Sequence, residues 1–289
     1  MDLRSTLPYN KLWIFSFVLT ALQVAGCGGG GKMLVEHIDQ LEDARLSDAL
    51  RMNLTATGGM DAWLEMQRVH AEAVGTVTDA DGGKSLVDQH HELSLLVPYA
   101  LDIASTSSDG IWLERYDAQG NVTLNLQGSE AVLDLDADVQ QGTALKLRLM
   151  IQALTQSAGL LHPNWRLRYV GLERKGGRLT HKIEATGSIV NPTATEEYLA
   201  TGEQLVVWID AKTLFFDRLW LRYRRGAGED ADDFGYLAAN LSIYKKQPGG
   251  LVLPTQVAIV RSDKFQQFSE REIMLVEYQR FTFIRDLED

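Results

Sequence analysis

From Val69 onward, apolar segments alternate with glycine-rich turns, and this repetition constrains the fold more than any other feature of the chain. The turn signals include "DADGGK", "DAQGN", "RKGGR" and "QPGG". Such turns join neighbouring antiparallel strands, whereas parallel strands need helix-length crossovers, which are missing here. We therefore expect residues 69–283 to form one antiparallel, curved, meandering sheet of about eleven strands.

Ten of these strands can be placed by their apolar pattern and their flanking turns. The expected segments are Leu86–Leu96, Gly110–Tyr116, Asn121–Leu126, Leu167–Arg174, Leu179–Gly187, Gln204–Ile209, Phe215–Arg224, Tyr236–Lys245, Leu251–Val260 and Glu270–Phe283.

Three segments have helical periodicity instead. Between Met33 and Leu54 the apolar residues fall on one stripe, which predicts a surface helix ended by Gly58 and Gly59. The sequence "MDAWLEMQRV" predicts a second, short helix that buries Trp63. A third helix, over Thr143–Leu161, interrupts the strands.

The third helix carries apolar residues on two sides. Leu147, Met150 and Leu154 share one stripe, while Leu145 and Leu149 point nearly the opposite way. Such a helix is either sandwiched inside the fold or roofs an apolar cavity. The alternative is a plain core helix with two exposed leucines.

Two late strands are apolar on both faces as well. In "QLVVWID" Trp208 opposes Val207 and Ile209, and in "LFFDRLWLRY" Trp220 opposes Leu219 and Leu221. A sheet with one face in water alternates more cleanly, so an apolar layer should cover the second face. That layer is either ordinary core or a cavity that accommodates lipid.

The only cysteine, Cys27, follows a sequence with the layout of a signal peptide. Arg4 and Lys11 precede an apolar stretch from Leu12 to Leu22, and small residues follow it. The stretch is too short to span a bilayer comfortably. A single cysteine cannot form an internal disulfide, so this thiol needs another role.

Val24-Ala25-Gly26-Cys27 resembles a bacterial lipobox. The resemblance implies that residues 1–26 are a lipoprotein signal peptide and that Cys27 becomes a lipidated N-terminus carrying diacylglycerol and an acyl chain. Two or three chains anchor a protein durably. Residues 27–32 then form a glycine-rich tether. Gly28 stands where an inner-membrane retention aspartate would be, which favours the outer membrane, with the protein facing the periplasm.

The charge of the chain excludes one class of partner. The sequence has 28 Lys and Arg against 39 Asp and Glu, a net charge of −11. Residues 1–26 contain Asp2, Arg4 and Lys11, so the remainder is at −12. A nucleic-acid-binding protein needs a basic surface, and we expect no such partner.

Catalytic and metal-binding motifs fail on inspection. "HHEL" lacks the second histidine of HExxH because Leu95 occupies its position, and His90 and His91 of one strand face opposite sides. "DLDAD", from Asp134, resembles the start of a calcium loop but has Val139 where glycine is required. No nucleophile elbow or nucleotide-binding motif is present. We expect no catalytic residues, no metal, no cofactor and no enzymatic activity.

The order of the elements resembles the LolA/LolB-like superfamily of periplasmic lipoprotein carriers and lipid-binding lipoproteins. The resemblance rests on the lipobox, the "GGMDAW" turn and helix, the strands with an inserted helix, "VVWIDAKTLFFDRL", and "YKKQPGGLVLPT" from Tyr244. It implies a single domain over residues 33–289, mainly β with helices (α+β). The domain would be an unclosed, curved antiparallel half-barrel roofed by helices over a hydrophobic cavity for acyl chains.

Two functions remain open at this point. In the first, lipid or lipoprotein acyl chains bind in the cavity, with Leu149, Met150, Trp208 and Trp220 among its lining residues. In the second, the chain is a structural or sensory envelope lipoprotein that binds a protein partner. An open apolar cavity favours the first function, whereas a core filled by the protein's own aromatic side chains favours the second.

Overall fold

A computed structural model describes residues 37–79, 81–94, 100–107, 110–117, 122–127, 137–161, 165–187, 204–224 and 234–284. The expected signal peptide, Cys27 and the tether lie outside these residues, as does most of the "DLDAD" segment.

In the described residues, twelve strands form one sheet in which every pair of neighbours is antiparallel. The strands are β1 (Arg68–Thr78), β2 (Lys84–Ser94), β3 (Leu101–Ser107), β4 (Gly110–Tyr116), β5 (Val122–Leu126), β6 (Trp165–Lys175), β7 (Arg178–Gly187), β8 (Gln204–Asp210), β9 (Phe216–Arg224), β10 (Phe234–Lys246), β11 (Val252–Ser262) and β12 (Phe268–Ile284). The predicted curved antiparallel sheet is therefore confirmed. The expected count omitted β3.

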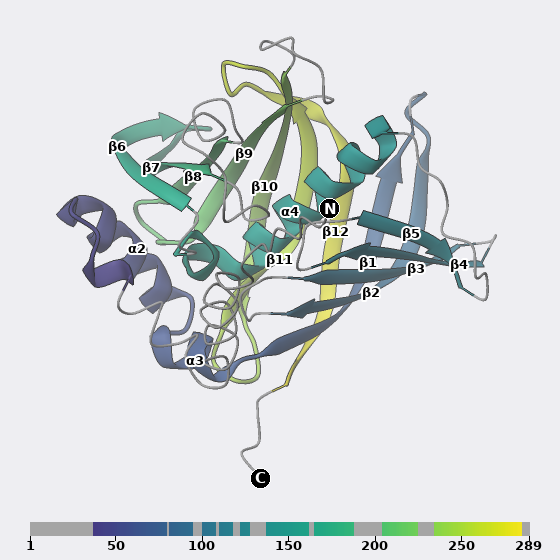
Figure 1. Ribbon diagram of the computed structural model, residues 1–289, viewed down its shortest axis with the longest axis horizontal. Helices are drawn as coiled ribbons and strands as arrows, with labels where there is room; N and C mark the ends of the chain where they lie inside the picture. Colours follow the sequence, from purple (N-terminus) through teal and green to yellow (C-terminus); the bar gives the residue numbers. More distant parts are fainter. Residues whose placement is uncertain are drawn as a thin grey trace, which may run out of the picture.

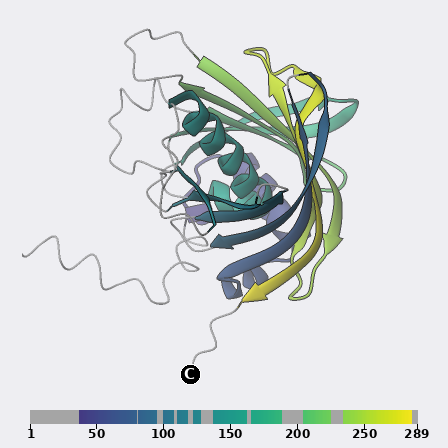
Figure 2. The same ribbon diagram turned by 90° about the vertical axis from the view of Figure 1, so that its right-hand side faces the viewer.

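The strand order explains how the sheet is built from two meanders. It runs β5-β4-β3-β2-β1-β12-β11-β10-β9-β8-β7-β6, so the first and last strands of the chain pair at its centre. The edges are β5 and β6, which are consecutive in the chain but do not pair. The sheet therefore curves strongly without closing into a barrel (Figure 2).

Helix α4 (Ala137–Leu160) connects these two edges. Because the chain must pass from β5 to β6 across the opening, α4 lies in the concave side of the sheet (Figures 1 and 2). It contacts β5, β9, β10 and β11. The predicted helix over Thr143–Leu161 is confirmed and begins six residues earlier than its apolar stripe indicated.

The N-terminal helix is shorter than predicted. Helix α2 spans Ala44–Ala56 and begins only after Asp43, whose carboxylate accepts a hydrogen bond from the Arg45 backbone N–H at 2.9 Å. This N-cap ends the preceding turn and starts a new helix. Gly59 follows the helix with φ 86°, a conformation that glycine adopts freely. The short helix α3 (Met60–Glu65) buries Trp63, as predicted.

The main core fills the space between the concave side of the sheet and the helices. Its largest contributions come from α2, α4 and the inward side chains of the strands. Residues 149–161 are buried without interruption, which is the pattern of a helix surrounded by protein on all sides. Leu145 and Leu149 are each 1% exposed. The helix is therefore sandwiched inside the fold, and the alternative with two exposed leucines is wrong.

Candidate functional site

The concave side of the sheet is the first candidate site, and α4 occupies it. The side chains of Leu145, Leu147, Leu149, Met150 and Ile151 are all buried in the main core. An apolar ligand on the concave face would meet these side chains first.

Polar contacts attach the first half of α4 to β4. The Lys146 ammonium lies 2.6 and 2.7 Å from the two carboxylate oxygens of Glu114, and both side chains are largely buried. The Arg148 Nε donates to the Tyr116 hydroxyl at 2.9 Å, and its guanidinium lies over the Tyr116 ring. Charge-assisted bonds of this kind are stronger than neutral ones, so they fix the helix against β4, next to the edge strand β5.

The second half of α4 contains a kink. Gln156 has φ 52° and ψ −138°, which interrupts the helix. Its amide nitrogen donates to the carbonyl oxygen of Ala153, and its amide oxygen accepts from the Tyr244 hydroxyl at 3.4 Å. The Gln152 amide donates to the Gln156 carbonyl at 2.8 Å. These bonds supply partners to the polar groups that the kink frees inside the core.

Beneath α4, a buried polar cluster joins β2 and β12, the two strands that flank β1. The ring of His91 on β2 lies between the Gln89 amide oxygen, 3.1 Å from Nε2, and the Tyr278 hydroxyl on β12, 3.2 Å from Nδ1. Burial is the main cause that lowers the pKa of His91 to about 3, with smaller contributions from the positive charge of Lys146 and from His90. His91 is therefore neutral in the folded protein at ordinary pH.

Trp208 and Trp220 lie on the other side of the sheet. They form a second cluster with Val206, Ala238 and Val260, separate from the main core that contains Leu149 and Met150. The four residues that we expected to line one cavity therefore divide into two pairs on opposite faces. The reason is the strand alternation itself, because Trp208 and Val207 point to opposite sides.

The turn between β11 and β12 covers this second cluster. The Trp220 indole N–H donates to the carbonyl of Asp263 at 3.0 Å, and the Phe268 ring meets the Trp208 ring edge-on at 5.9 Å. Lys175 and Lys182 lie over the Trp208 ring at 5.1 and 5.5 Å. Ordinary core, contributed by the chain itself, thus accounts for the apolar outer face of β8 and β9.

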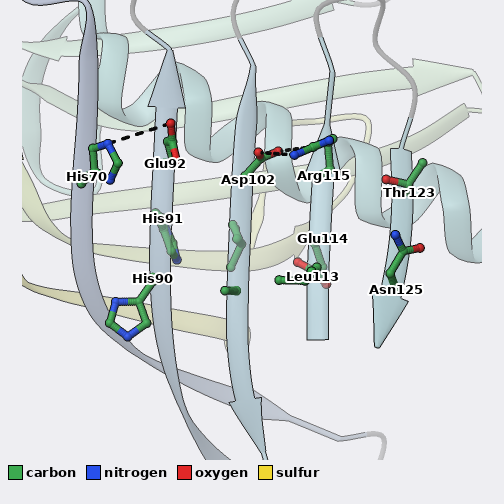
Figure 3. Close-up of a pocket in the computed structure, with 12 residues that line it drawn as sticks. His70, His90, His91, Glu92, Asp102, Leu113, Glu114, Arg115, Thr123 and Asn125 are labelled. Atoms are coloured by element: carbon green, nitrogen blue, oxygen red, sulfur yellow. Dashed lines mark hydrogen bonds and ion pairs between the residues drawn. The ribbon is translucent and has the colours of Figure 1, made fainter. Parts of the chain in front are cut away.

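A pocket of about 290 Å³ lies on β1–β5. Figure 3 shows a row of side chains across the strands, from His70 through Glu92, Asp102 and Arg115 to Thr123. These residues face away from the core, since their strand neighbours Val69, Leu93, Leu101, Tyr116 and Val122 are buried. The pocket is therefore on the outer face of the sheet. Of its lining residues, only His90, His91 and Glu92 of the "HHEL" segment stand out in the sequence.

The "HHEL" segment of β2 is divided between the two faces, as predicted. His90 is exposed and lines the pocket, whereas His91 is 2% exposed and belongs to the cluster beneath α4. Within the described residues, no group of three or more metal-ligating side chains is arranged to hold a metal ion. In the same residues, no helix has the length and apolarity needed to cross a membrane.

Similarity to known proteins is visible in three dimensions and not in sequence. No protein-family model matches the chain, and no curated protein matches it. A DUF1329 family protein from Desulfovibrio piger has a similar structure, with a TM-score of 0.50 at 13% identity, over 84% of this chain and 93% of that protein. At this identity the similarity concerns the fold alone.

Two further solved structures are less similar. A LolA superfamily protein from Nitrosomonas europaea has a TM-score of 0.43 at 10% identity and covers 90% of this chain and 96% of its own. A putative outer membrane lipoprotein-sorting protein domain from Vibrio parahaemolyticus has a TM-score of 0.43 at 12% identity, with 84% and 93% covered. The open, curved antiparallel sheet with a helix in its concave side is the architecture that the sequence resemblance implied. The fold is LolA-like. In this LolA-like fold the inserted helix is the element that fills the concave side.

Proposed function

We propose that this chain is a lipid-anchored protein of the bacterial envelope that binds acyl chains of lipids or lipoproteins on the concave side of its sheet. The observation that carries the proposal is the position of α4, a helix that is apolar on two sides and lies inside an unclosed, apolar sheet. An acyl chain would take the place of α4 side chains such as Leu149 and Met150.

The free energy lost by displacing apolar side chains of α4 and the free energy gained by burying an acyl chain are of similar size. Fully exposing one large apolar side chain of α4 costs about 1.5–3 kcal/mol, and five such side chains lie between Leu145 and Ile151. Burying a chain of sixteen carbons gains on the order of 10 kcal/mol at about 0.8 kcal/mol per methylene. A bound acyl chain can therefore compensate for displacing residues 145–151 of α4.

Membrane attachment and the domain division complete the proposal. Residues 1–26 are removed, Cys27 carries the lipid, residues 27–32 form the tether, and residues 33–289 form one domain. The anchored protein faces the periplasm from the outer membrane and acts by binding, not by catalysis.

A second candidate is a structural or sensory envelope lipoprotein that binds a protein partner. The specific observation in its favour is that the main core and the Trp208 cluster are both filled by the chain's own side chains.

Native mass spectrometry and lipid extraction of the full chain, purified from membranes, test the first proposal. We expect a bound lipid in addition to the anchor and saturable binding of a fluorescent fatty acid. Leu149→Glu should weaken this binding at least tenfold, whereas Leu172→Glu, at a leucine 55% exposed on β6, should not. Circular dichroism establishes that both variants are folded. A wild type with no second lipid and no saturable binding would overturn acyl-chain binding and favour the second candidate.

A further inference from the structure

The pocket on the outer face of β1–β5 is separate from the concave side. Nine of its twelve lining residues lie on strand positions that face away from α4, and the other three, His91, Ile103 and Glu114, alternate with them along β2, β3 and β4. An inference about this pocket is therefore independent of acyl-chain binding.

The pocket has a polar row and an apolar row, two residues apart along each strand. The strand register aligns Glu92 with Asp102, Asp102 with Arg115, and Arg115 with Thr123. Two residues away along each strand, the register aligns His90 with Ala104, Ala104 with Leu113, and Leu113 with Asn125. Figure 3 shows the polar row above Leu113 and Asn125.

The polar row is joined by ion pairs and carries both donors and acceptors. Arg115 donates from Nε and Nη2 to the two oxygens of Asp102 at 2.8 and 2.9 Å, which is the bidentate geometry. Glu92 lies 3.4 Å from the Arg68 guanidinium and 3.9 Å from the His70 ring nitrogen. Carboxylate oxygens in these pairs retain free acceptor positions, and the guanidinium retains free N–H groups.

The apolar row forms a small shelf between two polar side chains. Leu113 lines the pocket, and 37% of its surface is exposed to solvent there. Within the described residues, the Asn125 amide oxygen at one end of the shelf is buried and has no hydrogen-bond partner. A buried acceptor without a donor costs free energy, and a ligand hydroxyl can supply that donor.

The charges of the pocket favour a neutral ligand. The carboxylates Glu92 and Asp102 are matched by the guanidinium groups of Arg68 and Arg115. Strands β2, β3 and β4 are paired on both sides, so their backbone groups are not available to an added peptide strand. Recognition must therefore come from side chains that both donate and accept hydrogen bonds.

The geometry points to a binding site for one or two units of a neutral carbohydrate. A pyranose ring has an apolar face of C–H groups, which fits the shelf at Ala104 and Leu113. Its hydroxyls donate and accept around the edge, where Asp102, Arg115 and Thr123 lie. The volume of about 290 Å³ is at the lower end of ligand pockets, which suits a sugar and not a long acyl chain.

Saturation-transfer NMR on the full chain, in a zwitterionic detergent without sugar groups, tests this site. The probes are glucose, N-acetylglucosamine and their linear trisaccharides, with trilysine as a charged comparison. We expect saturable transfer to at least one sugar series, strongest at the C–H protons of one ring face. The series that binds distinguishes a simple hexose from an acetamido sugar.

Substitutions of pocket residues test whether the saturation transfer to sugars arises from binding in this pocket. Asp102→Asn and Leu113→Lys should each weaken sugar binding at least tenfold. Glu184→Gln is the matched control, because Glu184 also pairs with an arginine across two strands, at Arg168 on β6, outside the pocket. Transfer to trilysine alone, no transfer to any sugar, or sugar binding that is unchanged in both pocket variants would overturn the proposal.

Discussion

Asn53 of α2 and Ser157 of α4 are joined by a hydrogen bond inside the core, although 104 residues separate them. The Ser157 hydroxyl donates to the Asn53 amide oxygen at 2.7 Å, and the Asn53 amide nitrogen donates to the carbonyl of Leu214 at 2.7 Å. One fully buried side chain thus connects α2, the end of α4 just after its kink, and the turn between β8 and β9.

The first prediction follows from this connection. Asn53→Ala should lower the free energy of unfolding by about 2–4 kcal/mol, because it removes the amide partner of the buried Ser157 hydroxyl and of the partly buried Leu214 carbonyl. Met52→Ala, at the neighbouring exposed position, should cost less than about 1 kcal/mol. Urea denaturation followed by circular dichroism measures both. An equal loss in the two variants would mean that the connection contributes nothing.

A second prediction concerns pH and His91. Its pKa is about 3 in the folded protein because it is buried, against about 6.5 in an unfolded chain. Between these values the unfolded state binds more protons, so stability is complete above pH 6.5 and falls as the pH falls toward 3. At pH 5 this effect alone removes about 2 kcal/mol.

Replacement of each histidine of the "HHEL" segment tests this effect. His91→Gln should flatten the pH dependence of the urea midpoint between pH 7 and 5, whereas His90→Gln, on the exposed face, should leave it unchanged. A His91→Gln profile as steep as that of wild type contradicts the assignment.

The strand pattern was largely predictable from local sequence. The glycine-rich turns and the apolar alternation placed ten strands, and Gly110–Tyr116 has the predicted bounds. Strand β3 was missed because only Leu101 and Ile103 point to the core, and the rest of "LDIASTS" is small or polar. A strand with so few apolar residues is positioned by hydrogen bonds to its neighbours β2 and β4.

The candidate sites depended on contacts that local sequence does not encode. The apolar outer face of β8 and β9 predicted a covering layer, but its identity depends on a turn 43 residues beyond Trp220. The kink at Gln156 is not indicated by a glycine or proline at that position. Hydrogen bonds to buried partners stabilise it instead. The polar row of the outer pocket became visible only when the register aligned residues from five strands.

A third prediction tests the cover of the second cluster. Trp220→Phe removes the indole N–H that bonds the Asp263 carbonyl, so the amides of residues 263–267 should exchange with deuterium faster and stability should fall by about 1 kcal/mol. Trp165→Phe is the matched control, because within the described residues the buried Trp165 indole nitrogen has no hydrogen-bond partner. Fatty-acid binding should be unaffected by Trp220→Phe. Weaker binding would place Trp220 at the acyl site.

A fourth prediction concerns the anchor. If Cys27 is the lipidated N-terminus that we propose, Cys27→Ser should abolish the uptake of labelled palmitate and release the chain from the membrane fraction, because it removes the thiol to which diacylglycerol would be attached. Phase partitioning of cell extracts, followed by mass spectrometry of the N-terminal peptide, measures both effects. Undiminished palmitate in the variant would exclude lipidation at this residue.

The final prediction tests whether α4 must move for an acyl chain to bind. Glu114→Gln removes the charge that holds Lys146 at 2.6 Å, which lowers the cost of separating the first half of α4 from β4. Fatty-acid affinity should therefore rise about threefold to tenfold, equivalent to about 0.7–1.4 kcal/mol, while the free energy of unfolding falls. Glu184→Gln breaks a more exposed carboxylate–cation pair on β7, away from α4, and should leave the affinity unchanged, with at most a small loss of stability. An affinity that is unchanged or reduced in Glu114→Gln would show that acyl chains do not displace α4, because any ligand that competes with the helix must bind more tightly when the helix is held less strongly.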